Sequence, residues 1–429
     1  MITGVAEQIL PGGETLVRVD GAAVLVSNAV PSDVLELEMQ AKRRGVLRAD
    51  IKSVLEPSDQ RVAAPCPVAA WCGGCALQYI SVADQAALKS DWVVAAFKPL
   101  IDAETEIIAV HESPLHASSA QRRRVRWFVG CDAQGEFLGF YAPASHRAVR
   151  HSRCMVLTPA LNALRQRLEQ DLDLDGISSV QAVQLYDGIH VVLELEASAA
   201  MPDTVAVGKI NAIDAVPLQW WWRDADHIIR PLKKPMQVFH DLLPAGKQDI
   251  CLRVGPDDFV QGQEQGNREL IRQIQTWAGS VNRIADLFCG IGNLSLPLAA
   301  ATGAQLVGAE LNPASVRAAS ANAKLLGVSA QSMSAQFVVA NLFENFDLEP
   351  FIGADVLLLD PPRRGAKRVC SQIGRLLPKM IIMVSCDVAA GARDGALLRS
   401  HGYRLRALRG LDLFPYAGHV EAMSCWQRA

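Results

Sequence analysis

The chain has 429 residues, a length that predicts two or three domains instead of one compact core. Apolar residues make up 50%, charged residues 20%, and the formal net charge is −3. This composition is typical of a globular protein and excludes a globally basic nucleic-acid binder, so any such surface must be local.

The beginning of the chain shows no secretory leader pattern, and no apolar run is long enough to span a bilayer. We therefore expect a cytoplasmic protein with no membrane partner. In that compartment, the ten cysteines are better explained as ligands, nucleophiles or buried thiols than as disulfides.

Residues 1–57 are predicted to form a small, OB-like β-barrel. Short alternating runs, at 15–19, 23–26 and 34–37, are separated by turn signals. A barrel of this kind often binds oligonucleotides. Its end is basic, and those side chains either contact RNA or form a solvated edge strand. The basic residues are Lys42, Arg43, Arg44, Arg48 and Lys52.

Residues 58–257 are expected to form a central α+β domain. Its arginine run, 122–126, predicts a strand with one cationic face, which contacts phosphate or holds structural ion pairs. The tryptophan triplet at 220–222 favours packing over a stacking platform for bases.

The central segment also contains a compact cysteine motif, Cys-Pro-Val-Ala-Ala-Trp-Cys-Gly-Gly-Cys, and a fourth cysteine downstream. Four thiolates suit an iron–sulfur cluster or tetrahedral zinc. Zinc modules usually bring two Cys-x-x-Cys pairs, and only one is present, which favours iron–sulfur. The candidate ligands are Cys66, Cys72, Cys75 and Cys154.

Residues 258–429 alternate short apolar strands with Ala/Leu-rich helices, the pattern of a doubly wound, Rossmann-like parallel sheet. One helix is expected at 313–326. Strands are expected at 284–288, 305–309, 336–339, 356–359 and 381–384.

The first of these strands runs into a glycine loop, where Gly290 permits the turn and Gly292 permits close approach of a ligand. Glu310 ends the next strand, where a carboxylate can accept the ribose hydroxyls. Ser295 replaces the third glycine of a dinucleotide fingerprint. The loop therefore favours S-adenosylmethionine over NAD. Asp360-Pro-Pro-Arg363 should line the same crevice from the fourth strand.

Cys386 ends the fifth strand on the same sheet edge and is the candidate nucleophile. Its thiolate could add to carbon 6 of a pyrimidine and so activate carbon 5 for methylation. Glu421 is the candidate base that removes the carbon 5 proton. Cys289 is expected to pack without reacting. Asp387, beside the nucleophile, should oppose thiolate formation.

Together these motifs resemble the RNA uracil-5-methyltransferase family, in its 23S rRNA branch, over nearly the whole chain. The resemblance implies an opening TRAM barrel and a 4Fe–4S cluster on the four cysteines. It implies that Cys386 is the nucleophile and Glu421 the base. The residues that match the family's other binding positions are Gln261, Phe288, Asn293, Glu310, Asn341 and Asp360.

Three segments depart from the usual family pattern: Gln261-Gly262-Gln263, Ser385-Cys386-Asp387-Val388, and Tyr416, where a histidine is usual. The resemblance implies an S-adenosylmethionine-dependent enzyme that methylates carbon 5 of a flipped uridine in a single-stranded or loop region of 23S rRNA, acting as a monomer. A tRNA uracil-5-methyltransferase and a non-catalytic RNA-binding protein remain the alternatives.

Overall fold

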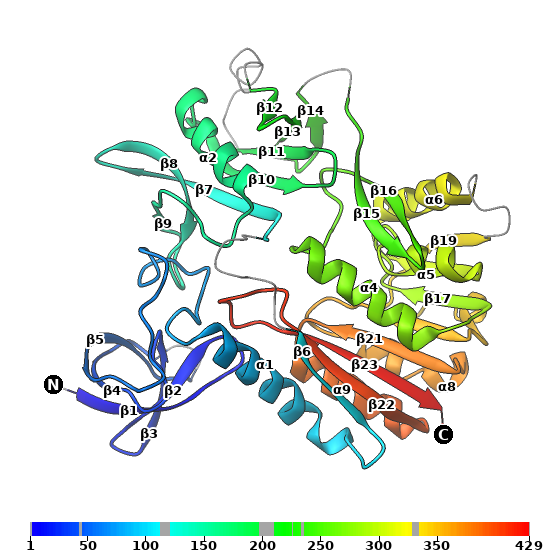
Figure 1. The fold of residues 1–429 in the computed structure, drawn as a ribbon, viewed down its shortest axis with the longest axis horizontal. Helices are drawn as coiled ribbons and strands as arrows, with labels where there is room; N and C mark the ends of the chain where they lie inside the picture. Colours follow the sequence, from blue (N-terminus) through cyan, green and yellow to red (C-terminus); the bar gives the residue numbers. More distant parts are fainter. Residues whose placement is uncertain are drawn as a thin grey trace.

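The computed structural model describes residues 2–42, 45–111, 121–196, 210–224, 226–232, 236–327 and 334–428. Three parts surround a common centre: an N-terminal barrel, a central β-rich part and a C-terminal α/β part (Figure 1). Within the described residues, no helix is long and apolar enough to cross a membrane.

The strands are β1 (Ile2–Ile9), β2 (Glu14–Val19), β3 (Ala22–Ser27), β4 (Val34–Met39), β5 (Arg48–Glu56), β6 (Glu106–His111), β7 (Arg124–Asp132), β8 (Gly135–Tyr141), β9 (Ala148–Val149), β10 (Ile177–Gln184), β11 (Ile189–Leu195), β12 (Ala212–Ile213), β13 (Val216–Arg223), β14 (Ile229–Pro231), β15 (Phe239–Ala245), β16 (Gln248–Val254), β17 (Arg283–Leu287), β18 (Gln305–Glu310), β19 (Ala335–Val339), β20 (Val356–Leu359), β21 (Met380–Ser385), β22 (Tyr403–Leu411) and β23 (Glu421–Arg428). The α-helices are α1 (Val82–Phe97), α2 (Pro159–Asp171), α4 (Glu264–Ala278), α5 (Ser295–Thr302), α6 (Pro313–Gly327), α7 (Lys367–Cys370), α8 (Ile373–Leu376) and α9 (Val388–Ser400).

The N-terminal strands close into a barrel in the order β1-β2-β3-β5-β4, as the alternating runs predict. Alternate side chains such as Val17, Val24 and Leu35 fill its interior and are fully buried. In the basic end of the barrel, Arg48 pairs with Glu14 and Lys52 with Glu38. These two cations therefore form intramolecular ion pairs, whereas the predicted contacts of Arg43 and Arg44 lie outside the described residues.

The central sheet runs β12-β13-β11-β10-β7-β8-β9, with β14 paired to β13. Helix α2 packs against this sheet and shares its apolar core. The tryptophan triplet packs, as predicted: Trp220 is fully buried, and its ring nitrogen donates to the Ile210 carbonyl at 2.9 Å. Trp221 likewise donates to His190.

The C-terminal sheet runs β19-β18-β17-β20-β21-β23-β22-β6. Strands β17 to β21 are parallel, and β23 inserts antiparallel between β21 and β22. The predicted strands and the predicted helix of this part are confirmed. Strand β6 comes from the segment assigned to the central domain but pairs with β22. Division of the chain at residues 57 and 257 therefore stays a proposal.

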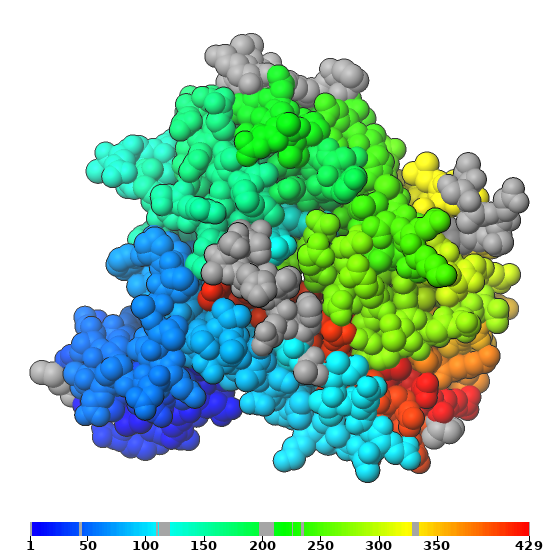
Figure 2. Space-filling view, in the orientation of Figure 1, coloured from blue at the N-terminus to red at the C-terminus, as the bar shows by residue number. Residues whose placement is uncertain are grey.

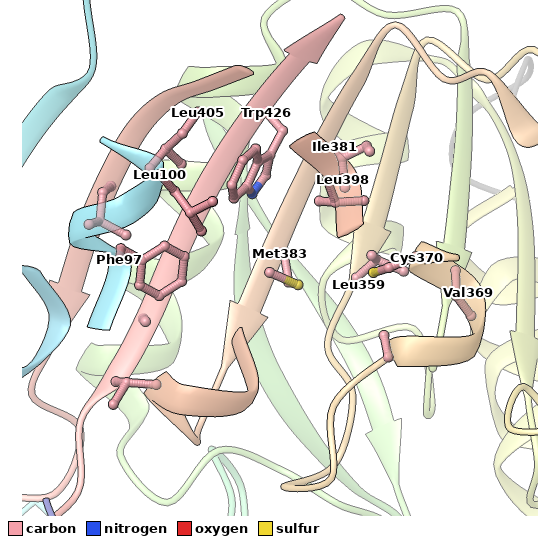
Figure 3. Packing of buried hydrophobic residues seen from close by; sticks show 14 of the residues in the cluster. Phe97, Leu100, Leu359, Val369, Cys370, Ile381, Met383, Leu398, Leu405 and Trp426 are labelled. Carbon is pink, nitrogen blue, oxygen red and sulfur yellow. The ribbon is translucent and has the colours of Figure 1, made fainter. Parts of the chain in front are cut away.

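Two apolar layers cover the faces of this sheet, as a doubly wound fold requires. One layer includes α4, α5 and α6, and the other includes α1, α7, α8 and α9. Figure 3 shows the second layer, in which Phe97 and Leu100 approach Trp426 on the sheet. Because both faces are covered, strands such as β20 are apolar throughout their length.

Candidate active site

A cavity of about 790 Å³ opens at the carboxyl ends of the parallel strands. Residues of the C-terminal part, shown in red, lie at the middle of one face, between the blue N-terminal and green central parts (Figure 2). The cavity brings together most of the predicted site residues: Gln261, Phe288, Gly290, Asn293, Glu310, Asp360, Cys386 and Glu421.

The glycine loop has the backbone geometry of a close-approach ligand site. Phe288 has a φ of +74°, which is unusual for a side chain of this size, and Gly290 has a φ of +53°. The N–H groups of Phe288 and Cys289 both donate to the Ala309 carbonyl, which fixes the loop beneath the cavity. These two hydrogen bonds hold the loop in its strained conformation, which is a form of pre-organisation.

Glu310 ends β18 and is oriented by backbone donors. Its Oε1 accepts from the N–H groups of Leu311 and Asn312, and its Oε2 lies 3.3 Å from the Gly290 nitrogen. The carboxylate therefore faces the cavity in a fixed position. Asn293 exchanges reciprocal 2.9 Å amide hydrogen bonds with Asn267 of α4.

Asn341 is the predicted residue whose side chain the structure does not place in the cavity wall. Its neighbours Ala340 and Leu342 line the cavity, whereas its own Oδ1 accepts the N–H of Phe343 at 3.2 Å. The side chain thus shapes the turn that presents Phe343. A direct ligand contact by Asn341 stays a prediction.

Gln261 is positioned by a buried ion pair from the arginine run. Arg123 is 3% exposed and forms two hydrogen bonds with Asp241, of 2.6 and 2.8 Å. Its Nε donates to the Gln261 carbonyl at 3.0 Å, and its backbone N–H to the Gly262 carbonyl. Arg123 is thus a structural residue, while Arg122 lines the cavity and Arg126 is half-exposed.

The nucleophile and base candidates follow paired ends of two strands. Cys386 follows β21, and Glu421 opens β23, its antiparallel neighbour. Both line the cavity, with Cys386 half-buried and Glu421 buried. Cys289, the other thiol of the cavity, is buried within the apolar core, and burial raises its pKa well above the usual value. Its expected packing is confirmed.

The protein groups around Cys386 oppose ionisation of its thiol. Burial, followed by the charges of Glu421 and Asp360, raises the pKa of Cys386 to about 11, and Arg363 acts in the other direction. Asp387 has a different role from the one expected: its Oδ1 accepts the Ala390 N–H at 2.8 Å and caps α9.

Two buried carboxyl groups, Asp286 and Glu421, and the half-buried Asp360 line the cavity. Burial raises the pKa of Asp286 and of Asp360 to about 7. Burial, reinforced by Asp360, raises the pKa of Glu421 to about 8. One oxygen of Asp286 has no hydrogen-bond partner among the described residues. An acidic, desolvated cavity of this kind favours a cationic ligand, and S-adenosylmethionine carries a sulfonium.

The structure also places His419 in the cavity, two residues before Glu421. Its Nε2 lies 3.4 Å from Nη2 of Arg363, and burial together with Arg363 lowers the pKa of His419. His419 is a site residue that the sequence motifs do not predict. The signal it offered was its position beside the predicted base.

The four candidate cysteine ligands gather beside this cavity. Burial and the neighbouring thiols of Cys154 and Cys72 raise the pKa of Cys75 to about 12. Burial and the neighbouring thiol of Cys66 likewise raise the pKa of Cys72. Backbone N–H groups face the sulfurs of Cys72 and Cys154. As placed, however, the described residues hold no group of three or more His, Cys, Asp or Glu side chains close enough to bind a metal ion.

The cysteine loop is held against the active site. Gly73 hydrogen-bonds the Tyr141 carbonyl at 2.9 Å, and an added Cβ would meet that oxygen at 2.8 Å. Gly74 lines the cavity. On the other side, the Asn162 amide binds both the N–H and the carbonyl of Cys154. These contacts bring one edge of the four-thiol region to the cavity wall.

Comparison with known proteins agrees with this geometry. The tRNA (Uracil-5-)-methyltransferase family model matches residues 232–428. The 23S rRNA (uracil(1939)-C(5))-methyltransferase RlmD of Pseudomonas aeruginosa is 33% identical over 429 residues, covering 98% of this chain and 93% of that protein. RlmD of Pectobacterium atrosepticum is 32% identical over 425 residues, covering 96% and 91%.

The fold is also that of a solved structure, the Pyrococcus abyssi tRNA (uracil-54, C5)-methyltransferase in complex with S-adenosyl-L-homocysteine. The two structures superpose with a TM-score of 0.76 and 19% identity, over 99% of both chains. This likeness shows the methyltransferase fold with its small N-terminal barrel. With relatives above 30% identity over almost their whole length, the chain belongs to the RNA (uracil-5-)-methyltransferase family, in its RlmD branch.

Proposed function

We propose that the protein methylates carbon 5 of a specific uridine in 23S rRNA, using S-adenosylmethionine. One observation carries the chemistry: Cys386 and Glu421 line a single cavity together with the glycine loop and Glu310, the carboxylate that we assign to the ribose hydroxyls. The rRNA substrate is supported by the RlmD relatives, which match the chain from end to end.

In the proposed reaction, two protein groups each carry out one chemical step: nucleophilic addition and proton removal. The Cys386 thiolate adds to carbon 6 of the uracil, and the electrons of the 5,6 double bond move toward O4. Bound S-adenosylmethionine supplies the electrophilic methyl carbon. The Glu421 carboxylate then takes the proton from carbon 5, the double bond re-forms and the Cys386 sulfur leaves.

The shape of the cavity supports a mechanism in which the target uridine flips out of its stack. Cys386 is half-buried within a concave site, and a base stacked in a helix cannot reach a nucleophile in that position. A uridine in a single-stranded or loop region would enter at the lowest cost. Arg122 and Phe259 line the same cavity, which provides a cation and an aromatic face to neighbouring nucleotides.

Two variants test the mechanism. Cys386→Ala should abolish methyl transfer while S-adenosylmethionine still binds, because the thiol is not required for the glycine-loop contacts. Glu421→Gln should accumulate a covalent enzyme–RNA adduct, visible on a denaturing gel. Full activity of the first variant, or no adduct with the second, would contradict the assigned roles.

The substrate is tested by mapping 5-methyluridine by mass spectrometry in rRNA and tRNA from cells with and without the gene. Loss of one modified position in 23S rRNA is expected. Loss in tRNA alone would favour the tRNA reaction, a possibility raised by the name of the matching family model and of the superposed structure.

We also propose that Cys66, Cys72, Cys75 and Cys154 hold a 4Fe–4S cluster. The mutual electrostatic effect of the thiols and the N–H groups that face two of them suit a cationic, sulfur-ligated group. When bound, the cluster would shape the loop at the cavity wall. The purified protein should be brown and contain iron and acid-labile sulfide; a colourless zinc protein would overturn the assignment.

A further inference from the structure

The loop that leads to Glu421 is fixed by side chains that lie outside the reaction cavity. We call residues 412–420, between β22 and β23, the base loop. It is the red loop near the centre of Figure 1, beside α1. Its backbone is hydrogen-bonded by the barrel, by the segment after the cysteines and by α1.

Gln85 of α1 joins two of these segments through one amide. Its Nε2 donates to the carbonyls of Leu77 and Ile80, at 3.0 and 3.1 Å. Its Oε1 accepts the N–H of Tyr416 at 2.9 Å. The side chain is 1% exposed, so these bonds are made without competition from water. Gln85 therefore ties the base loop to the chain that follows Cys75.

Lys89, one turn further along α1, fixes the start of the same loop. Its Nζ lies 2.7 Å from Oδ1 of Asp412 and donates to the Phe414 carbonyl at 2.9 Å. Lys89 is fully buried, and a buried ammonium is tolerated only when it is paired and hydrogen-bonded. The base loop supplies both partners.

Two backbone bonds complete the attachment. The N–H of Leu77 donates to the Tyr416 carbonyl, and the N–H of Gly12 donates to the Gly418 carbonyl, both at 2.8 Å. Gly12 belongs to the turn of the barrel between β1 and β2. The base loop thus receives its conformation from parts of the chain more than 300 residues away in sequence.

We propose that Gln85 and Lys89 are positioning residues for the proton-removal step. The inference rests on the proposed function of Glu421, which follows the base loop directly. A carboxylate must lie within hydrogen-bond reach of the proton it removes, and a displacement of about 1 Å can cost on the order of 100-fold in rate. Among the described residues, neither side chain hydrogen-bonds Cys386 or β21, so an effect of either one on the reaction passes through the base loop.

The test uses the full-length protein as purified and compares Gln85→Met with the wild type. The variant should bind S-adenosylmethionine normally, form the covalent RNA adduct and release methylated RNA on the order of 100-fold more slowly. The adduct should therefore accumulate on a denaturing gel. Gln85→Glu keeps an acceptor for Tyr416 and, when protonated, one donor, so it should recover most of the release rate.

Trp92→Phe is the matched control on the same helix, because it removes a buried hydrogen bond that goes to the Ile9 carbonyl and not to the base loop. It should lower stability without adduct accumulation. If Gln85→Met loses adduct and product together, in proportion to its folded fraction, the residue is merely structural and the proposal fails. Wild-type release by Gln85→Met would also overturn it. Absence of adduct in Glu421→Gln identifies the different case in which the proposed function itself is wrong.

Discussion

Ser385 of β21 and Ala422 of β23 are paired partners in an antiparallel ladder. One residue closer to the cavity lie Cys386, just past the end of β21, and Glu421, the first residue of β23. Strand register therefore brings the nucleophile and base candidates together at the point where the base loop meets β23. Their proximity has an electrostatic consequence, because Glu421 adds to burial in raising the pKa of Cys386 to about 11.

Thiol reactivity should report these charges. Arg363 is the cation that lowers the pKa of Cys386, so Arg363→Gln should slow alkylation of that thiol by iodoacetamide. Glu421→Gln removes a negative charge and should speed the reaction above about pH 8, where the carboxylate is ionised. Rates are measured at Cys386 by peptide mass spectrometry, since Cys131 and Cys251 are exposed and also react.

Arg363→Gln and Glu421→Gln are expected to change the alkylation rate in opposite directions. A general change in the accessibility of Cys386 would instead change both rates in the same direction. Arg126→Gln is the matched arginine control, because Arg126 pairs with Glu194 outside the cavity. It should leave the rate unchanged. An equal change of rate in all three variants would mean that the charges do not control the thiol.

Binding of S-adenosylmethionine should release protons. Asp286, Asp360 and Glu421 have pKa values raised to about 7, 7 and 8, mainly by burial. A bound sulfonium favours their ionised forms, so affinity should rise as pH increases from 6 to 8. Calorimetry in buffers of different ionisation enthalpy counts the protons. S-adenosylhomocysteine, which has a neutral thioether, should show a smaller effect, and equal proton release by both ligands would contradict the prediction.

The same three carboxyl groups determine whether the free energy of unfolding rises or falls with pH when no ligand has been added. Their folded-state pKa values lie above the unfolded values, so the folded state binds more protons between about pH 4 and 8. Their contribution is fully present below the unfolded pKa values and is lost as pH rises through the folded ones. We expect the ligand to stabilise the protein more at pH 8 than at pH 6, as judged by the shift in Tm.

Gly418→Ala should disconnect the barrel from the base loop. An added Cβ would lie 2.2 Å from the Gly12 carbonyl carbon and 2.4 Å from the Gly13 nitrogen, so backbone must move. Product release should slow while S-adenosylmethionine binding persists. Gly327→Ala is the comparison, because an added methyl there meets nothing within 4 Å and Gly327 does not have a positive φ. A Gly418→Ala variant with wild-type turnover would show that the barrel contact is dispensable.

The local sequence pattern is sufficient to predict much of the candidate site. Gly290, Glu310, Asp360 and Cys386 each follow or end a parallel strand, and such ends converge by the geometry of the sheet. Hydrophobic runs located those strands closely because both faces are buried. The small barrel was equally readable, since its strands alternate and its turns are short.

Long-range pairing was what the sequence could not reveal. Nothing local indicates that β6, from before residue 112, pairs with β22, or that Gln85 and Lys89 of α1 meet the base loop. The arginine run predicts one cationic face, yet Arg123 is buried against Asp241, whereas Arg126 is half-exposed. Which residues pair across such long stretches of sequence depends on tertiary packing, and the hydrophobic periodicity of the sequence does not reveal that packing.

Arg123 should contribute to both stability and ligand placement. Arg123→Met leaves Asp241 buried without its partner, which should lower the free energy of unfolding by about 3–5 kcal/mol. It also removes the hydrogen bond to the Gln261 carbonyl. Denaturant unfolding and methyl-transfer kinetics should therefore both be affected, whereas Arg126→Gln should change stability by less than about 1 kcal/mol.

A second substitution separates the two effects. Arg123→Met combined with Asp241→Leu removes both buried charges and should recover much of the stability, because an apolar pair of similar volume can replace a buried ion pair. The Gln261 carbonyl would still lack its donor. Methyl transfer should therefore remain low after stability returns, and parallel recovery of both would show that Arg123 acts on the fold alone.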